Sequence, residues 1–373
     1  MDNKKLYELS EKILVKEIIK LLEVDEMLLD GFGHDSAFIN TTIHEDEILL
    51  MNTDRSGINT AYTLGLANGE CVGDFGVSHA ISDIIASGGQ PLAISIALLL
   101  PDNLTLGFVK EVMIGAQKAA KKYGAFLAAG DTKKNNKFAM VVTATGKAQK
   151  TERLTRANAK KGDFLIVTGH LGTMLAGKIA FKQNLELSTQ AINLFKKALI
   201  FQNPPYTLST KLSKSKLTNA CTDISDGLSS SIYNLCNASN LGAIIDESKI
   251  PIHKETLKIA TTLNIRPIQL TLTGGDWQFL YSVPEENIKK IKEIAQMANF
   301  PISIIGKLIE ENTIVIKTLE NKYKHLLRLE NDKFSKHSGE SFLTLLEKRI
   351  PLFGKDINSN LKNKLMEIQY ENY

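Results

Sequence analysis

Short apolar runs alternate with longer helical patterns through the first 150 residues of this chain, and this alternation constrains its fold more than any other feature. The apolar runs read as strands and cover residues 47–54, 91–101, 125–131 and 137–148. Helical periodicity is found between them, at residues 73–89 and 106–124. Strands that alternate with helices in this way predict a strand-rich α/β unit.

A charged, polar stretch at residues 151–163 predicts a domain junction. Beyond it, strands are expected at 163–168, 242–248, 277–284 and 312–317, and helices at 173–181, through a long region to about 240, and at 286–298. We therefore predict an N-terminal domain over residues 1–150, a C-terminal domain over 151–320 and a lysine-rich extension over 321–373.

Composition excludes several classes of protein. A length of 373 residues allows two domains, and a net charge of +4 without arginine-rich runs gives no reason to expect nucleic-acid binding. The cysteines Cys71, Cys221 and Cys236 form no C-x-x-C pair, which argues against a disulfide framework or a zinc site. The first 26 residues predict an amphipathic helix without the apolar core of a signal peptide, and the longest apolar run, Leu92 to Leu100, is too short to cross a membrane. These observations predict a cytoplasmic protein with no membrane partner.

Six aspartates stand where a strand ends, where a glycine turn begins or on a helix. They are Asp35, Asp54, Asp83, Asp131, Asp223 and Asp226. The last two are three residues apart, a spacing that predicts one side of a helical turn. Carboxylates beside apolar strands are costly to bury unless a cation neutralises them, and Mg²⁺ commonly joins carboxylates to nucleotide phosphates. Together they predict a multi-metal phosphate site, although each alone is as readily a turn or helix-capping residue.

Glycines accompany two of these positions, at Gly130-Asp131-Thr132 and Asp226-Gly227, and a further aspartate at Gly274-Gly275-Asp276. A glycine lets backbone N–H groups approach an anion closely, although it also serves in ordinary turns. The segment from Gly172 to Lys178 matches the first part of a P-loop. Its next residue is Ile179, where magnesium coordination requires Ser or Thr, so we predict a packed helix there.

Seven motifs, in order, resemble a family that includes aminoimidazole ribonucleotide synthetase, selenophosphate synthetase, a hydrogenase maturation protein and thiamine-monophosphate kinase. They are most similar to the last of these, and the resemblance runs from about residue 8 to about residue 310. The motifs lie at residues 31–36, 52–54, 79–88, 129–132, 154–156, 223–228 and 273–277. Selenophosphate synthetase is disfavoured because the first seventy residues lack cysteine, and the hydrogenase maturation protein because this chain ends in Tyr-Glu-Asn-Tyr.

The resemblance implies an α/β (α+β) fold of two domains, with an N-terminal mixed sheet that joins two subunits in a homodimer and a C-terminal α/β domain. It implies Mg²⁺ ligands at Asp35, Thr53, Asp54, Asp83, Asp131, Asp223 and Asp226. It also implies ATP contacts at Gly130, Asp131, Thr132, Arg156 and Ser225, with Asp131 and Asp226 central to catalysis. The implied reaction transfers the γ-phosphate of ATP to a phosphorylated small molecule, converting thiamine monophosphate to thiamine diphosphate.

Departures from the family pattern fall on the acceptor side. His34 replaces the first acid of an Asp-Asp pair, and Ala61 stands where the family has a substrate-side histidine. Tyr62, Asp276 and Trp277 are expected to face the substrate, with Trp277 either stacking on a flat ring or packing in the core. His79 lies on the less apolar side of its helix and is expected to face solvent. A kinase with another acceptor, a synthetase that phosphorylates a carbonyl or amide oxygen, and a non-catalytic nucleotide-binding subunit stay open as alternatives.

Overall fold

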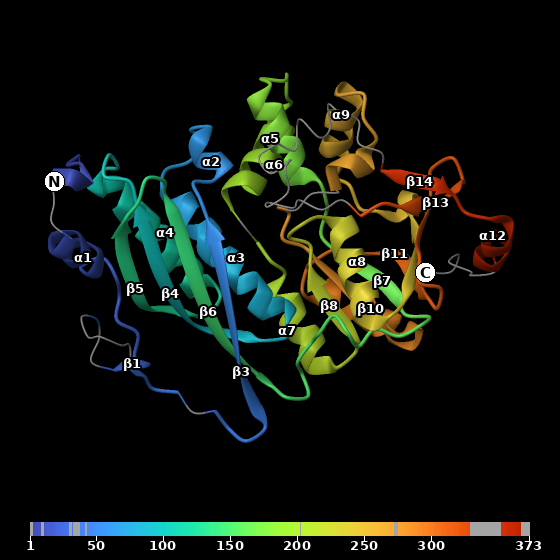
Figure 1. Ribbon diagram of the computed structural model, residues 1–373, viewed down its shortest axis with the longest axis horizontal. Coiled ribbons are helices and arrows are strands. Elements are labelled where there is room, and N and C mark those ends of the chain that lie inside the picture. The colour runs from blue at the N-terminus through green and yellow to red at the C-terminus, as the bar shows by residue number, and fades with distance from the viewer. Residues whose placement is uncertain are drawn as a thin grey trace. The chain divides into compact units, whose positions relative to one another are not determined.

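The computed structural model describes residues 3–8, 11–29, 32, 38–41, 43–201, 203–271, 275–328 and 352–366. The chain divides into two compact units (Figure 1). Unit 1 comprises Met1–Arg153 with Lys196–Tyr206, and unit 2 comprises Leu154–Phe195 with Thr207–Tyr373.

Unit 1 is built on a four-stranded mixed sheet with the strand order β3-β6-β4-β5. The strands are β3 (Glu47–Ser56), β4 (Gln90–Leu100), β5 (Phe126–Lys134) and β6 (Ala139–Gln149). β6 pairs antiparallel with β3 and β4, whereas β4 and β5 are parallel. Along β4 and β6 every second residue is buried, because one face of the sheet packs against helices.

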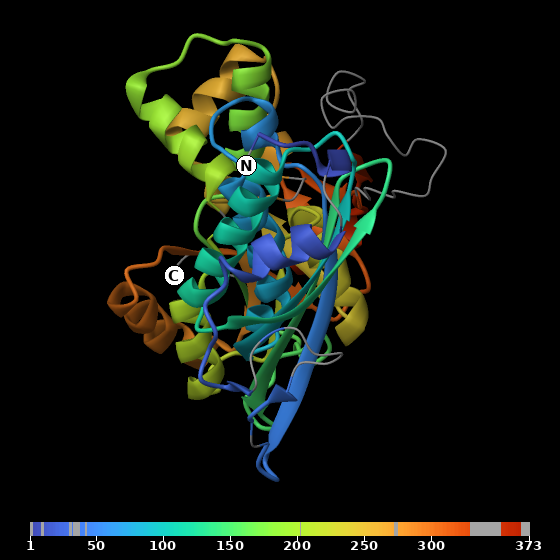
Figure 2. The same cartoon turned by 90° about the vertical axis from the view of Figure 1, so that its left-hand side faces the viewer.

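The covering helices of unit 1 are α3 (Glu70–Ala86) and α4 (Leu106–Lys122), which lie along one side of the strands (Figure 2). Thr105 begins α4 by accepting a hydrogen bond from the Phe108 N–H at 3.1 Å. The two helices approach so closely that a Cβ at Gly73 would stand 1.9 Å from the carbonyl oxygen of Val112. The smaller elements are η1 (Leu6–Glu8), α1 (Glu11–Ile19), β1 (Leu28–Leu29), β2 (Phe38–Ile39) and α2 (Thr60–Thr63).

Unit 2 contains an eight-stranded sheet with the order β14-β13-β12-β9-β11-β7-β10-β8. Its strands are β7 (Phe164–Thr168), β8 (Ala220–Asp223), β9 (Gly242–Asp246), β10 (Phe279–Val283), β11 (Ile302–Ile309), β12 (Ile314–Lys317), β13 (Tyr323–Leu326) and β14 (Phe353–Asp356). All neighbours are antiparallel except β9 and β12, which are parallel.

The helices of unit 2 include α8 (Leu228–Ser239), whose Leu228, Ile232 and Leu235 join the sheet core. The other helices are α5 (Thr173–Lys182), α7 (Tyr206–Ser215), α9 (Lys254–Thr262), α10 (Ile288–Met297) and α12 (Ser359–Met366), with short 3₁₀ helices η2 (Glu247–Lys249), η3 (Pro267–Thr271) and η4 (Glu285–Asn287). Helix α6 (Thr189–Ile200) begins in unit 2, and its residues from Lys196 onward belong to unit 1. Residues of α5, α6 and α9 form a second core, in which Ile179 and Phe195 are fully buried.

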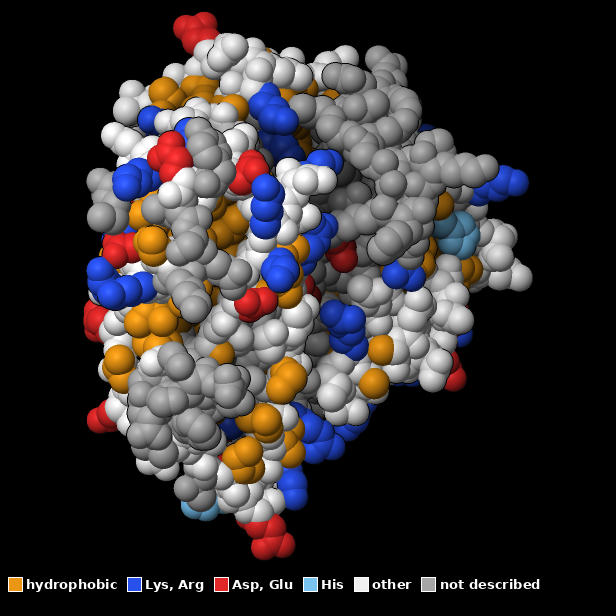
Figure 3. All heavy atoms as spheres, turned by 60° about the vertical axis from the view of Figure 1, so that its left-hand side comes forward, with side chains coloured by type: hydrophobic (Ala, Val, Ile, Leu, Met, Phe, Trp, Pro, Cys, Tyr) orange, Lys and Arg blue, Asp and Glu red, His pale blue; other side chains and the backbone are white. Residues whose placement is uncertain are grey.

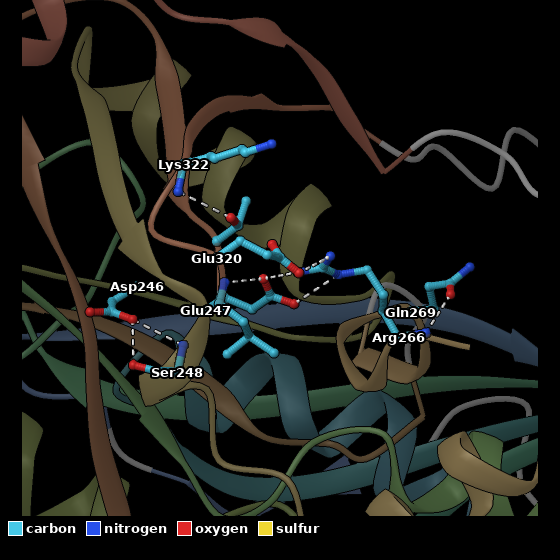
Figure 4. A network of polar contacts seen from close by, with 9 residues as sticks. Asp246, Glu247, Ser248, Arg266, Gln269, Glu320 and Lys322 are labelled. Carbon is cyan, nitrogen blue, oxygen red and sulfur yellow. Dashed lines mark hydrogen bonds and ion pairs between the residues drawn. The ribbon is translucent and has the colours of Figure 1, made fainter. Parts of the chain in front are cut away.

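A buried ion pair joins separate segments of unit 2 (Figure 4). Arg266 donates from Nη2 to Glu247 Oε2 at 2.6 Å and from Nη1 to Glu320 Oε1 at 2.9 Å. The Glu247 side chain is almost fully buried, and it also accepts the Leu319 N–H at 3.0 Å. Because Glu247 has both a cationic and a neutral donor, its burial is compensated. The guanidinium of Arg266 further packs over the Phe353 ring of β14.

The expected long helical region to about residue 240 is wrong, because β8 interrupts it between α7 and α8. The paired positions Asp223 and Asp226 also do not form a helical turn, since Asp223 ends β8 and α8 begins only at Leu228. Residues 321–366 contribute β13, β14 and α12, none of which the sequence pattern indicated.

Candidate nucleotide and metal site

Asp54 on β3 faces helix α3. Its Oδ2 accepts a hydrogen bond from Asn52 Nδ2 at 2.9 Å, and the same amide nitrogen donates to the Ala80 carbonyl at 3.1 Å. On the other side, Asp54 Oδ1 lies 3.9 Å from His79 Nε2, with the side chains of His79 and Asp54 23% and 26% exposed. His79, expected to face solvent, is thus partly exposed, and its imidazole is directed toward a predicted metal ligand.

Asp83 lies one helical turn beyond His79 on α3, and both are partly buried. Residues four apart share one side of a helix, so α3 carries an imidazole and a carboxylate on the same side. The His79 ring also contacts the Phe75 ring, with centroids 5.9 Å apart, which restricts its orientation. The spacing of His79 and Asp83 was visible in the sequence, but the register that brings Asp54 to this helix was not.

Gly130, Asp131 and Thr132 lie on the edge strand β5. Gly130 and Asp131 are exposed, whereas Thr132 is buried. A Cβ at Gly130 would stand 2.6 Å from the Ile96 carbonyl oxygen, so no other residue fits there without displacing β4. Thr132 Oγ1 is buried without a hydrogen-bond partner among the residues that the structure describes. Buried hydroxyls are normally satisfied, so this one is suited to a ligand oxygen at the strand edge.

Asp54 and Asp131 do not come together within unit 1. They lie on β3 and β5, which are opposite edges of the four-stranded sheet, three strand spacings or about 14 Å apart. Strand pairing aligns Asp54 with Gly130 in one row across the sheet and Asp131 with Arg55 in the next row, so the two carboxylates point to opposite faces. Thr53 also lies on the face away from the helices, where its Oγ1 is 2.9 Å from Thr143 Oγ1.

Asp223 and Arg156 form an ion pair in unit 2. Arg156 Nη2 lies 3.8 Å from Asp223 Oδ1, and Arg156 Nε donates to Thr222 Oγ1 at 3.0 Å. The Asp223 side chain is buried, whereas that of Arg156 is half exposed. The Arg156 guanidinium thus neutralises a buried carboxylate at the end of β8. The exposed half of the Arg156 side chain stays accessible to an anionic ligand.

The loop from Ser225 to Gly227 connects β8 to α8. Ser225 is partly buried and Asp226 is exposed. Gly227, the residue before the helix, has φ 92°, a conformation that other residues rarely adopt. An exposed carboxylate therefore stands directly before the N-terminus of a 12-residue helix, whose N–H groups and dipole favour anions.

Asp276 caps a different helix. Its Oδ2 accepts the Gly172 N–H at 2.6 Å and its Oδ1 accepts the Met174 N–H at 2.9 Å, at the start of α5. Burial raises the Asp276 pKa to about 6, although the hydrogen bonds from Met174 and Gly172 oppose the shift. N–H groups of the P-loop-like segment thus donate to this carboxylate, which agrees with the prediction of a packed helix.

Trp277 and Tyr62, two of the expected substrate residues, are buried and partly buried, respectively. Trp277 is only 4% exposed and has φ 54°, which is rare for a bulky residue. Tyr62 is partly buried, with its ring centroid 5.0 Å from that of Phe108. Substrate contact by either residue stays a prediction. Asp35 and His34 lie outside the described residues.

The predicted metal ligands are divided between the units: Thr53, Asp54, Asp83 and Asp131 lie in unit 1, and Asp223 and Asp226 lie in unit 2. In the part of the chain that the structure describes, no three His, Cys, Asp or Glu side chains gather to hold a metal ion. The same part contains no helix long and apolar enough to cross a membrane. The three cysteines are free thiols in buried positions.

Comparison with known families defines the class of protein. Residues 33–148 match the AIR synthase related protein, N-terminal domain, and residues 160–318 match the AIR synthase related protein, C-terminal domain. The chain is thus a two-domain AIR synthase related protein, as the resemblance and the mixed α/β fold predicted.

The chain belongs to the thiamine-monophosphate kinase family. It is 30% identical over 280 residues to the thiamine-monophosphate kinase of Buchnera aphidicola subsp. Acyrthosiphon pisum, covering 74% of this chain and 84% of that protein. The enzyme of Pyrococcus horikoshii is 29% identical over 316 residues, or 84% of this chain and 94% of that one. The solved structure of AaThiL complexed with AMPPCP and TMP has a TM-score of 0.63 and 27% identity, covering 84% of this chain and 95% of that chain. These matches confirm the predicted family, fold and enzyme class, a phosphotransferase.

Proposed function

We propose that this chain transfers the γ-phosphate of ATP to thiamine monophosphate, forming ADP and thiamine diphosphate, with Mg²⁺ as its cofactor. The observation that carries this proposal is the loop from Ser225 to Gly227, which presents an exposed carboxylate before the N-terminus of α8. Such a terminus attracts phosphate, and an aspartate beside it can hold the cation that accompanies a nucleotide. Relatives of the chain are thiamine-monophosphate kinases, and AaThiL binds AMPPCP and TMP.

The donor set fits Mg²⁺, because Asp54, Asp131 and Asp226 offer carboxylate oxygens that are at least partly exposed. We assign Asp54, Asp83, Asp131, Asp223 and Asp226, together with Asp35 and Thr53, to holding Mg²⁺ ions, with Asp54 and Asp131 of one chain serving different ions. When bound, Mg²⁺ neutralises charge on the phosphate oxygens.

The protein's own residues orient the nucleotide. The proposal assigns phosphate contacts to Arg156, whose side chain is half exposed, and to Thr132, whose buried hydroxyl has no partner among the described residues. Ser225 and Gly130 would adjoin the phosphates. The acceptor phosphate is already ionised, so its oxygen attacks without a general base. Catalysis then depends on alignment and charge neutralisation.

A homodimer through the face of the unit 1 sheet that is turned away from α3 and α4 completes the proposal. Hydrophobic side chains reach the molecular surface between charged ones (Figure 3). On β3, Leu49 and Met51 are 47% and 68% exposed. Exposed apolar groups on an open sheet face favour a protein interface. Asp131 points to the same face, so in the dimer it lies at the interface and can serve a site that Asp54 of its own chain does not reach. We place the enzyme in the cytoplasm, where ATP is available.

A second candidate is a kinase with a different phosphorylated acceptor. Ala61 is fully buried, so the histidine that the family has at this position would find no room here. The acceptor site therefore lacks one contact of the thiamine-phosphate kinases, and another residue must replace it or another substrate must fit.

Incubation of the full chain with ATP, Mg²⁺ and thiamine monophosphate, followed by ³¹P NMR, tests the proposal. The expected products are ADP and thiamine diphosphate. Turnover only with other phosphorylated metabolites would support the second candidate. ADP and inorganic phosphate that form only with an amine donor would indicate a synthetase, and nucleotide binding without turnover would indicate a non-catalytic subunit.

A further inference from the structure

The pairing of His79 with Asp54 differs from an ordinary hydrogen bond. The distance of 3.9 Å between His79 Nε2 and Asp54 Oδ1 exceeds the range of such bonds. Metal–ligand bonds of imidazole nitrogen and carboxylate oxygen are each about 2.0–2.2 Å, so two ligands of one ion stand about 3.0–3.4 Å apart in octahedral or tetrahedral geometry. His79 Nε2 and Asp54 Oδ1 therefore need to approach by about 0.5–0.9 Å to share an ion, a shift that a change of side-chain torsion can supply.

Neighbouring residues restrain the side chains of both His79 and Asp54. Asn52 donates to the other oxygen of Asp54, and this leaves Oδ1 directed toward the helix. Phe75 packs against the imidazole one turn earlier on α3. With 23% and 26% exposure, the side chains of His79 and Asp54 are partly shielded yet reachable by an ion from solvent. Ligands restrained in this way lose little freedom on binding a metal.

We infer that His79 is a nitrogen ligand of the metal held by Asp54, so that this position binds Co²⁺ or Zn²⁺ more tightly than an all-oxygen site does. Imidazole favours these ions over Mg²⁺, which prefers oxygen. Nucleotide phosphate oxygens and water supply the remaining ligands, as is usual where the protein gives only one or two. The inference rests on the proposed nucleotide–metal function and adds a preference among metals to it.

Electron spin-echo envelope modulation of Mn²⁺ bound with AMPPCP tests the inference directly, because it detects nitrogen bonded to the ion. The full chain is prepared unlabelled and with ¹⁵N-histidine, which separates imidazole from adenine nitrogen. Replacement of ¹⁴N by ¹⁵N modulation on labelling, and its loss in His79→Asn, is the expected result. Nitrogen modulation that does not change on ¹⁵N-histidine labelling, or that persists in His79→Asn, overturns the inference.

Metal affinity provides a second measurement. His79→Asn is expected to weaken Co²⁺ binding in the presence of AMPPCP at least about 10-fold while Mg²⁺ binding changes little. His44→Asn, on an exposed loop of the same unit, is the matched control and should leave both unchanged. Equal loss of Co²⁺ and Mg²⁺ affinity would contradict nitrogen ligation. If Mn²⁺ does not bind the wild-type chain at all, the proposed function fails with it; binding without imidazole modulation removes only this inference.

Discussion

Two segments of unit 2 share the order strand–glycine turn–helix, but we propose only one of them as a nucleotide site. The first joins β7 to α5 through Gly172 and the second joins β8 to α8 through Gly227, and both glycines have positive φ. In the first, Asp276 already accepts the N–H groups of the opening helical turn. In the second, Asp226 is exposed before the helix. The comparison teaches that glycine spacing alone does not define a phosphate site, because a side chain such as Asp276 can already accept the N–H groups of the helix terminus.

Substitution of Asp226 should give the largest effect. Asp226→Ala removes an exposed carboxylate that we assign to the metal, so ATP turnover should fall by about 10³-fold or more while the fold is retained. ADP release measures the turnover and the melting temperature monitors the fold. Turnover close to wild type would show that Asp226 does not belong to the active site. The β7–α5 and β8–α8 segments would then have no demonstrated functional difference.

At the other segment, Asp276→Ala should reduce stability. The Gly172 and Met174 N–H groups lose their acceptor, which costs about 1–3 kcal/mol of unfolding free energy. Urea denaturation measures this loss, and Asp276→Asn, which keeps one acceptor oxygen, should lose less. An unchanged unfolding free energy in Asp276→Ala would show that the cap is dispensable.

Titration of Asp276 sharpens the comparison further. Its pKa is about 6 in the folded chain, against about 3.9 when unfolded. Between these values the unfolded chain has released the proton and the folded chain retains it, so stability falls as pH rises from about 4 to 6 and then levels off. Denaturation across this window should show the decline in the wild type and a shallower one in Asp276→Asn. The same slope in both would assign the decline to other groups.

The smallest effect is expected at Arg156. Arg156→Lys keeps a charge near Asp223 but loses the hydrogen bond from Nε to Thr222 and the planar fork that suits phosphate. The KM for ATP should rise about 10-fold, with less change in kcat. A fall in kcat alone would give Arg156 a role in the transition state instead of nucleotide binding.

Local sequence pattern predicted the regular elements but not the contacts between distant segments. β4 and β6 were predicted as strands because each is a continuous apolar run, and most of their residues are indeed buried. β8 was missed because four residues before a polar turn carry too little pattern, and β11 because a register shift near Gly306 breaks the alternation. The cap of α5 by Asp276 joins residues about a hundred positions apart, and no local rule anticipates it.

In the candidate site, too, local features could be predicted from the sequence and long-range contacts could not. Residue type and glycine spacing indicated Gly130, Asp131 and Asp226 as candidate site residues, because these features can be recognised from neighbouring residues in the sequence. The separation of Asp54 from Asp131 follows from strand order and register, which only the folded sheet defines. The approach of His79 to Asp54 depends likewise on how α3 lies on β3.

Amide hydrogen exchange of the full chain, with and without Mg²⁺ and AMPPCP, compares the two helix termini in one measurement. Slower exchange at residues 225–231, with little change at residues 172–176, is the result expected if nucleotide phosphate binds before α8 and Asp276 keeps the α5 terminus. Protection confined to residues 172–176 would contradict the assignment, because the ligand would then occupy the helix that we consider already capped.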